Sequence, residues 1–113
     1  MTENLKTTLI QSDLHWEDAE ANRAKFEEKI KNIEGNTDLI ILPEMFTTGF
    51  SMHAEKLAEN NDGETLNWMI SIAEKHNSAI TGSVIIRENN HYYNRLFFVF
   101  PDGSFQKYDK KHT

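Results

Sequence analysis

An apolar run that stops at a proline constrains the fold of this chain more than any other feature. The aliphatic residues Leu39–Leu42 are followed directly by Pro43 and Glu44. A short aliphatic run of this kind predicts a buried strand. The strand must end at Pro43, because proline has no N–H to donate to a central sheet. Glu44 therefore stands at the carboxyl end of a strand, where open α/β sheets place their sites.

A glutamate at that edge, beside apolar neighbours, is a candidate proton carrier. Partial removal from water raises the pKa of a carboxyl group, which suits it to accept and return protons near neutral pH. A solvated loop glutamate is the alternative interpretation. A second motif, Tyr108-Asp109-Lys110-Lys111-His112, lies far downstream and favours the catalytic interpretation.

The spacing of apolar residues elsewhere predicts a single α/β domain. A helix is expected where Phe26, Ile30 and Ile33 share one face. We expect helices at 17–33 and 62–76, and strands at 5–11, 37–42, 78–87, 92–100 and 105–108. Residues 45–61 are expected to form a long loop or a loop with a short helix. The strand–helix–strand order predicts parallel neighbours, and the later strands form a meander joined by turns. The predicted architecture is a mixed sheet with helices on one face.

Composition excludes several classes of function. The chain has 113 residues, 38% hydrophobic and 27% charged, as in a small soluble domain. A net charge of -6 argues against nucleic acid or an anionic membrane as the main partner. No apolar run can span a bilayer, and Met1–Lys6 is too polar for a signal-peptide core, so a cytoplasmic location is expected. The four histidines at positions 15, 53, 76 and 91 show no metal-ligand spacing and are predicted to be surface residues.

Motifs spread along the whole chain resemble those of the nitrilase, or carbon–nitrogen hydrolase, superfamily. They are Leu42-Pro43-Glu44, Tyr93-Asn94, Pro101-Asp102-Gly103, the segment 108–112, and the set Gln11, Trp16 and Asn22 near the start. Within that superfamily, residues 44–52 look most like the omega-amidase branch. The resemblance implies an α-β-β-α sandwich, with residues 1–113 forming the N-terminal part of a single domain. Because family members are considerably longer, we expect this sequence to be a piece of a larger protein.

The resemblance also implies an activity and its catalytic residues. The family members are amidases and related hydrolases with a Glu, Lys and Cys triad and no cofactor or metal. The implied substrate is a small linear amide, the terminal amide of a 2-oxo dicarboxylic acid monoamide. Glu44 would relay protons and Lys110 would stabilise the oxyanion of the intermediate, while Lys111, its neighbour on the strand, would face the other way. The chain contains no cysteine, so residues 1–113 alone are expected to be inactive.

Other residues are assigned to the surroundings of the site. Phe46, Phe50 and Met52 are candidates for the substrate pocket, with simple loop packing as the alternative. Tyr93 and Asn94 are expected to pack and hydrogen-bond near the substrate rather than react. Glu44 and Lys110 are expected on adjacent strand ends.

Two other classes of protein remain open at this point. A metal-dependent phosphoesterase or endonuclease of similar four-layer fold would also carry a Glu after a strand, as a magnesium ligand. Such an enzyme would prefer a basic groove, which an acidic chain does not favour. A non-catalytic module is the third possibility, and the sequence that follows Thr113 would separate the three.

The expected partners are a small-molecule amide and a protein surface that covers the open face of the sheet. That surface would belong to a second copy of the chain or to the C-terminal half of the same domain. We place the open face on residues such as Phe97, Val99 and Ile85 or their strand neighbours.

Overall fold

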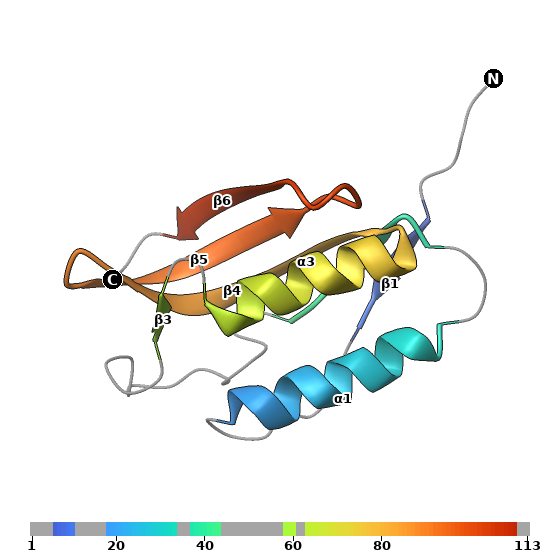
Figure 1. The fold of residues 1–113 in the computed structure, drawn as a ribbon, viewed down its shortest axis with the longest axis horizontal. Helices are drawn as coiled ribbons and strands as arrows, with labels where there is room; N and C mark the ends of the chain where they lie inside the picture. The colour runs from blue at the N-terminus through green and yellow to red at the C-terminus, as the bar shows by residue number, and fades with distance from the viewer. Residues whose placement is uncertain (1–5, 11–17, 34–36, 44–57, 61–62, 111–113) are drawn as a thin grey trace.

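The described residues form a single mixed sheet with two helices packed on one of its faces (Figure 1). The computed structural model describes residues 6–10, 18–33, 37–43, 58–60 and 63–110. Its elements are β1 (Thr7–Leu9), α1 (Ala19–Lys31), β2 (Leu39–Ile41), β3 (Glu59–Asn60), α3 (Glu64–His76), β4 (Ala79–Glu88), β5 (His91–Val99) and β6 (Phe105–Lys110). The order of strands is β1-β2-β4-β5-β6, with β3 paired to β4 as well. The predicted mixed sheet with helices on one face is confirmed.

Strand directions bring several carboxyl ends to one edge of the sheet. β1, β2 and β4 are parallel, with Leu39 opposite Ala79 and Ile41 opposite Thr81. β5 is antiparallel to β4, and β6 is antiparallel to β5. β6 therefore runs in the same direction as β2 and β4. The end of the sheet where these three strands finish is called the carboxyl edge below.

One end of each described helix has an identifiable cap. Asp18 caps α1, because its Oδ1 accepts a hydrogen bond from the backbone N–H of Ala21 at 3.0 Å. α3 ends where Asn77 adopts a left-handed conformation with φ of 50°. Neither helix is long and apolar enough to cross a membrane, a finding that covers only the described residues.

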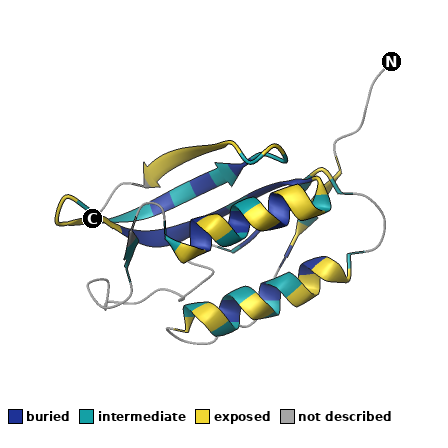
Figure 2. Ribbon diagram, in the orientation of Figure 1, coloured by how far each residue is buried: buried dark blue, intermediate teal, exposed yellow. Residues whose placement is uncertain are grey.

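The core lies between the helices and one face of the sheet, as the buried stripes in Figure 2 show. It is built from the apolar side of each helix and alternate strand residues: Phe26, Ile30, Leu66, Met69, Ile72, Ile40, Ile80, Val84, Ile86, Phe97 and Val99. Placing Phe97 and Val99 on an open face was therefore wrong. Side chains alternate along a strand, and these two residues fall on the side covered by the helices.

The opposite face of the sheet carries apolar side chains that no described element covers. Leu9 and Tyr108 are 58% and 67% exposed. Leu96, Phe98 and Tyr108 help to line a hollow of about 320 Å³ on β5 and β6. Ile85 belongs to this face by its register with Asn94, although it is only 4% exposed. We call this surface the open face.

The hairpin turn between β4 and β5 fixes the register of the later strands. Asn89 and Asn90 have φ angles of 52° and 64°, the left-handed values of a two-residue turn that matches the twist of a hairpin. The next turn uses Gly103 at φ of 90°. Hydrogen bonds from the hydroxyl and the backbone N–H of Ser104 hold the pKa of Asp102 below its ordinary value.

Most element boundaries differ from the expectation by one or two residues, and two of the differences have an identifiable reason. β3 falls in the segment expected to be a loop, because two paired residues are too few to show a period. β6 extends to Lys110 rather than ending at Tyr108, because the pairing with β5 continues through the polar residues Asp109 and Lys110.

We predict that residues 1–113 expressed alone self-associate through the open face. Each large apolar side chain left in water forfeits roughly 1.5–3 kcal/mol of burial. Replacing both Leu9 and Tyr108 with Lys should shift the species toward the monomer in sedimentation velocity, whereas Glu28→Lys on the exposed side of α1 should leave it unchanged. A well-folded monomer of the unaltered residues, with a cooperative melt, would show that this face needs no cover.

Candidate functional site

The carboxyl edge is where the structure places the two motif-bearing segments. The backbone N–H of Leu42 still donates to the carbonyl of Thr81 at 2.9 Å, and Leu42 is buried, so the ladder continues until Pro43. Glu44 comes next in the chain. Glu44 itself lies outside the described residues, as do Phe46, Phe50, Met52, Lys111 and His112.

Lys110 lies at the same carboxyl edge, on β6, which is the last strand in the order of the sheet. Lys110 is the last residue of β6, and it is paired with Asn94 of β5. Asn94 is in turn paired with Ile85 of β4. The expectation of adjacent strand ends was wrong, because β4 and β5 lie between β2 and β6. Three strand steps at about 4.8 Å each separate the two segments by about 14 Å. The hairpins carry β5 and β6 away from β2, which a pattern of single strands cannot reveal.

Asn94 and Tyr93, expected together near the substrate, lie on opposite faces of β5. Asn94 is on the open face, opposite Ile85, and its buried Oδ1 has no hydrogen-bond partner among the described residues. Tyr93 is on the helix face, where its ring lies 5.1 Å from the guanidinium carbon of Arg95. Of these two residues, Asn94 is therefore the one that lies beside the register position of Lys110 on the open face.

A buried arginine beside this edge was missed in the sequence. Arg95 is only 2% exposed. Its Nε and Nη2 donate to the two oxygens of Asp109 at 2.5 and 3.0 Å, and Nη2 also donates to Glu88 at 2.7 Å. The hydrogen bonds to Asp109, helped by Glu88, raise the pKa of Arg95 above its ordinary value despite burial. The sequence did contain a signal for this buried charge. Residues 95, 97 and 99 alternate along one strand and so share one face, where Phe97 and Val99 are core residues and position 95 carries an arginine.

A second polar cluster joins α1, β3 and the start of α3. The backbone N–H of Thr65 donates to Glu59 Oε1 at 2.8 Å, and its hydroxyl bonds the other oxygen of Glu59. Arg23 donates to the Thr65 hydroxyl and to Glu64, both at 3.0 Å. Thr65 is fully buried, and Glu59 is paired with Ile86 near the carboxyl end of β4. The cluster therefore fixes the first turn of α3 against the strand that leads to the carboxyl edge.

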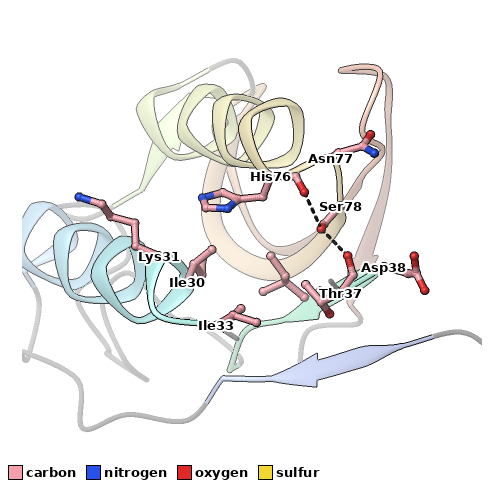
Figure 3. Close-up of a pocket in the computed structure, with 9 residues that line it drawn as sticks. Ile30, Lys31, Ile33, Thr37, Asp38, His76, Asn77 and Ser78 are labelled. Carbon is pink, nitrogen blue, oxygen red and sulfur yellow. Dashed lines mark hydrogen bonds between the residues drawn. The ribbon is translucent and has the colours of Figure 1, made fainter. Parts of the chain in front are cut away.

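A hollow of about 320 Å³ opens at the other end of the sheet (Figure 3). It is lined by Asp38, which precedes β2, and by the loop after α3, where Ser78 donates to the carbonyls of Thr37 at 2.6 Å and His76 at 3.1 Å. His91 is exposed as predicted, but His76 is half-buried in this hollow. The hollow lies at the amino ends of β2 and β4, so it is separate from the carboxyl edge.

Within the described part of the chain, no three His, Asp or Glu side chains gather closely enough to hold a metal ion.

Comparison with protein families gives a match over nearly the whole chain. Residues 6–113 match the family model described as carbon-nitrogen hydrolase. The chain is 41% identical over 108 residues to the Escherichia coli K12 protein named omega-amidase YafV, covering 96% of this chain and 41% of that protein. It is 29% identical over 106 residues to the 2-oxoglutaramate amidase of Bacillus subtilis, covering 91% and 41%. The chain thus spans about two-fifths of the length of these relatives.

Solved structures show the same fold. A CN-hydrolase superfamily protein from Xanthomonas campestris, whose active site carries an arsenic adduct, superposes with a TM-score of 0.92 at 40% identity. The alignment covers 98% of this chain and 42% of that one. Saccharomyces cerevisiae Nit3, of the nitrilase superfamily, gives a TM-score of 0.81 at 23% identity over 96% of this chain and 44% of its own, which supports the fold alone. The expected nitrilase-type α/β sandwich is therefore confirmed as the fold class.

We predict that Thr65→Val lowers the free energy of unfolding by about 1–3 kcal/mol, because it leaves Glu59 and Arg23 without the buried hydroxyl that joins them. Urea denaturation of the full-length protein would measure the loss. Ser71→Ala, at an exposed position of the same helix, should change the value by less than about 0.5 kcal/mol. Equal effects of the two substitutions would contradict the role given to the cluster.

Proposed function

Because this chain belongs to the carbon–nitrogen hydrolase family, we propose that the protein containing it is an amidase. Its substrate would be a small linear amide, the terminal amide of a 2-oxo dicarboxylic acid monoamide. The observation that carries this proposal is the 41% identity, over 96% of the chain, to a protein named omega-amidase. The weaker match to a 2-oxoglutaramate amidase supports the same substrate class.

Catalysis is assigned to three groups, of which two belong to this chain. Glu44 would act as the general base, taking the proton of a thiol nucleophile and delivering it to the departing ammonia. Lys110 would donate to the oxyanion that forms when the thiol attacks the amide carbon. The nucleophile would be a cysteine beyond residue 113, because the chain itself contains none.

The topology supports this assignment by bringing both segments to the carboxyl edge. β2 and β6 run in the same direction, so the junction at Pro43 and the position of Lys110 lie at the same end of the sheet. The two segments are three strand steps, about 14 Å, apart with β4 and β5 between them, so a shared substrate and the third group would have to lie over these two strands.

Asn94 would help to orient the substrate. Its buried Oδ1 lacks a partner among the described residues and can accept a hydrogen bond from the amide or from Lys110. Phe46, Phe50 and Met52 are proposed to line the substrate pocket. Tyr93 would support the site indirectly, through its contact with Arg95 on the helix face.

Residues 1–113 would form the N-terminal part of one hydrolase domain, and the remainder of that domain would cover the open face. The apolar exposure of Leu9, Leu96 and Tyr108 on that face supports this arrangement. The cover would supply the second sheet of the sandwich and carry the cysteine.

We predict that Lys110→Met in the full-length protein lowers kcat for 2-oxosuccinamate about 100- to 1,000-fold, as loss of one oxyanion donor does elsewhere. Ammonia release would measure the rate. The matched control is Lys107→Met, an exposed lysine on the same strand, which should keep kcat within about twofold.

Glu44→Gln should reduce turnover to background, because an amide cannot relay protons, and Glu28→Gln should not. Normal turnover by either Lys110→Met or Glu44→Gln would remove that residue from the mechanism.

Residues 1–113 alone should release ammonia from 2-oxosuccinamate only at the background rate, because no thiol is present to form a thioester. The same assay on the full-length protein provides the positive control. Turnover by residues 1–113 without any added chain would show that the thioester mechanism is wrong.

A further inference from the structure

We propose that Arg95 is a positioning residue that acts through Asp109 to fix Lys110 at the carboxyl edge. The inference rests on the proposed function of Lys110. Neither Arg95 nor Asp109 was expected to have a role from the sequence. Both lie on the helix face of the sheet, and Asp109 precedes Lys110 in the chain.

The need for such an anchor follows from the exposure of β6. Within the described residues β6 pairs with β5 only, and residues 105–109 are all exposed (Figure 2). At the start of the strand, the ring of Phe105 contacts Phe97 edge-on with centroids 6.0 Å apart. At the other end, Asp109 is bonded to Arg95 through both carboxylate oxygens. The position of Lys110 at the end of β6 therefore depends on these bonds.

The contact between Arg95 and Asp109 is directional. Two N–H groups of one planar guanidinium meet two oxygens of one carboxylate, at 2.5 and 3.0 Å. Such a bidentate pair fixes the orientation of the carboxylate as well as its distance. A slip of β6 by a single residue would break both bonds and exchange the faces of every side chain on the strand.

The exposed fractions of the two side chains distinguish the roles of Arg95 and Asp109. The side chain of Arg95 is 2% exposed, whereas that of Asp109 is 38% exposed. Arg95 is also held by Glu88 at 2.7 Å and by the ring of Tyr93. The arginine is therefore part of the rigid sheet, and Asp109 is the group that it holds in place. Glu88 shares the arginine but lies at the end of β4, far along the chain from Lys110.

This difference between Glu88 and Asp109 provides a matched experiment. Asp109→Asn and Glu88→Gln each neutralise one carboxylate partner of Arg95, so both should lower the melting temperature of the full-length protein. Only Asp109→Asn should also lower kcat for 2-oxosuccinamate, by about 10- to 100-fold, with KM within about threefold. Glu88→Gln should keep kcat within about twofold. Equal losses of kcat in the two variants, or an unchanged kcat in Asp109→Asn, would overturn the proposal.

Two further measurements keep the test decisive. If Asp109→Asn does not fold, Asp109→Glu retains the charge but lengthens the side chain, and it should still lose kcat; full activity would contradict the positioning role. Hydrogen exchange of the β6 peptide should rise more in the Asp109 variant than in Glu88→Gln. This readout does not depend on catalysis. A wild-type protein without amidase activity would therefore refute the proposed function alone, whereas equal exchange in the two variants would refute the positioning of β6.

Discussion

The pairing of β4 with neighbours on both sides is the constraint on which the rest of the structure depends. β2 and β3 bond one side of β4 in parallel, and β5 bonds the other side along its whole length. Its buried residues, including Ile80, Val84 and Ile86, receive the apolar stripe of α3. Because β4 sets the direction of every other strand, it also decides which strand ends meet at the carboxyl edge.

The two faces of the sheet differ in how far their apolar side chains are covered. The helix face is covered over the central strands, where core residues such as Phe26, Met69 and Phe97 are fully buried. The open face carries Leu9 and Tyr108 in contact with water and a hollow along β5 and β6. Burial of apolar surface is the main favourable term in folding, so an uncovered apolar face favours association with another protein surface. This asymmetry agrees with a chain that spans about two-fifths of the length of its relatives.

Charge at the carboxyl edge is organised around Arg95. A guanidinium can be buried only if its donors are satisfied, and here two carboxylates and an aromatic face surround it. The cluster lies on the opposite face of β5 from Asn94, whose Oδ1 is unused by the described residues. The sheet thus separates an ionic cluster, suited to support, from the polar group that we propose contacts the substrate.

The sequence by itself determined most of the elements and the order of the motifs. Local patterns are sufficient for this: the aliphatic run before Pro43, the helical spacing of Phe26 and Ile30, and the turn residues at Asn89-Asn90 all act between near neighbours in the chain. Only the tertiary structure decided which faces the strands present, that β4 and β5 separate β2 from β6, and that Arg95 meets Asp109 and Glu88. These facts depend on strand register, which is set by hydrogen bonds between residues distant in sequence, and a shift of one residue would reverse every face.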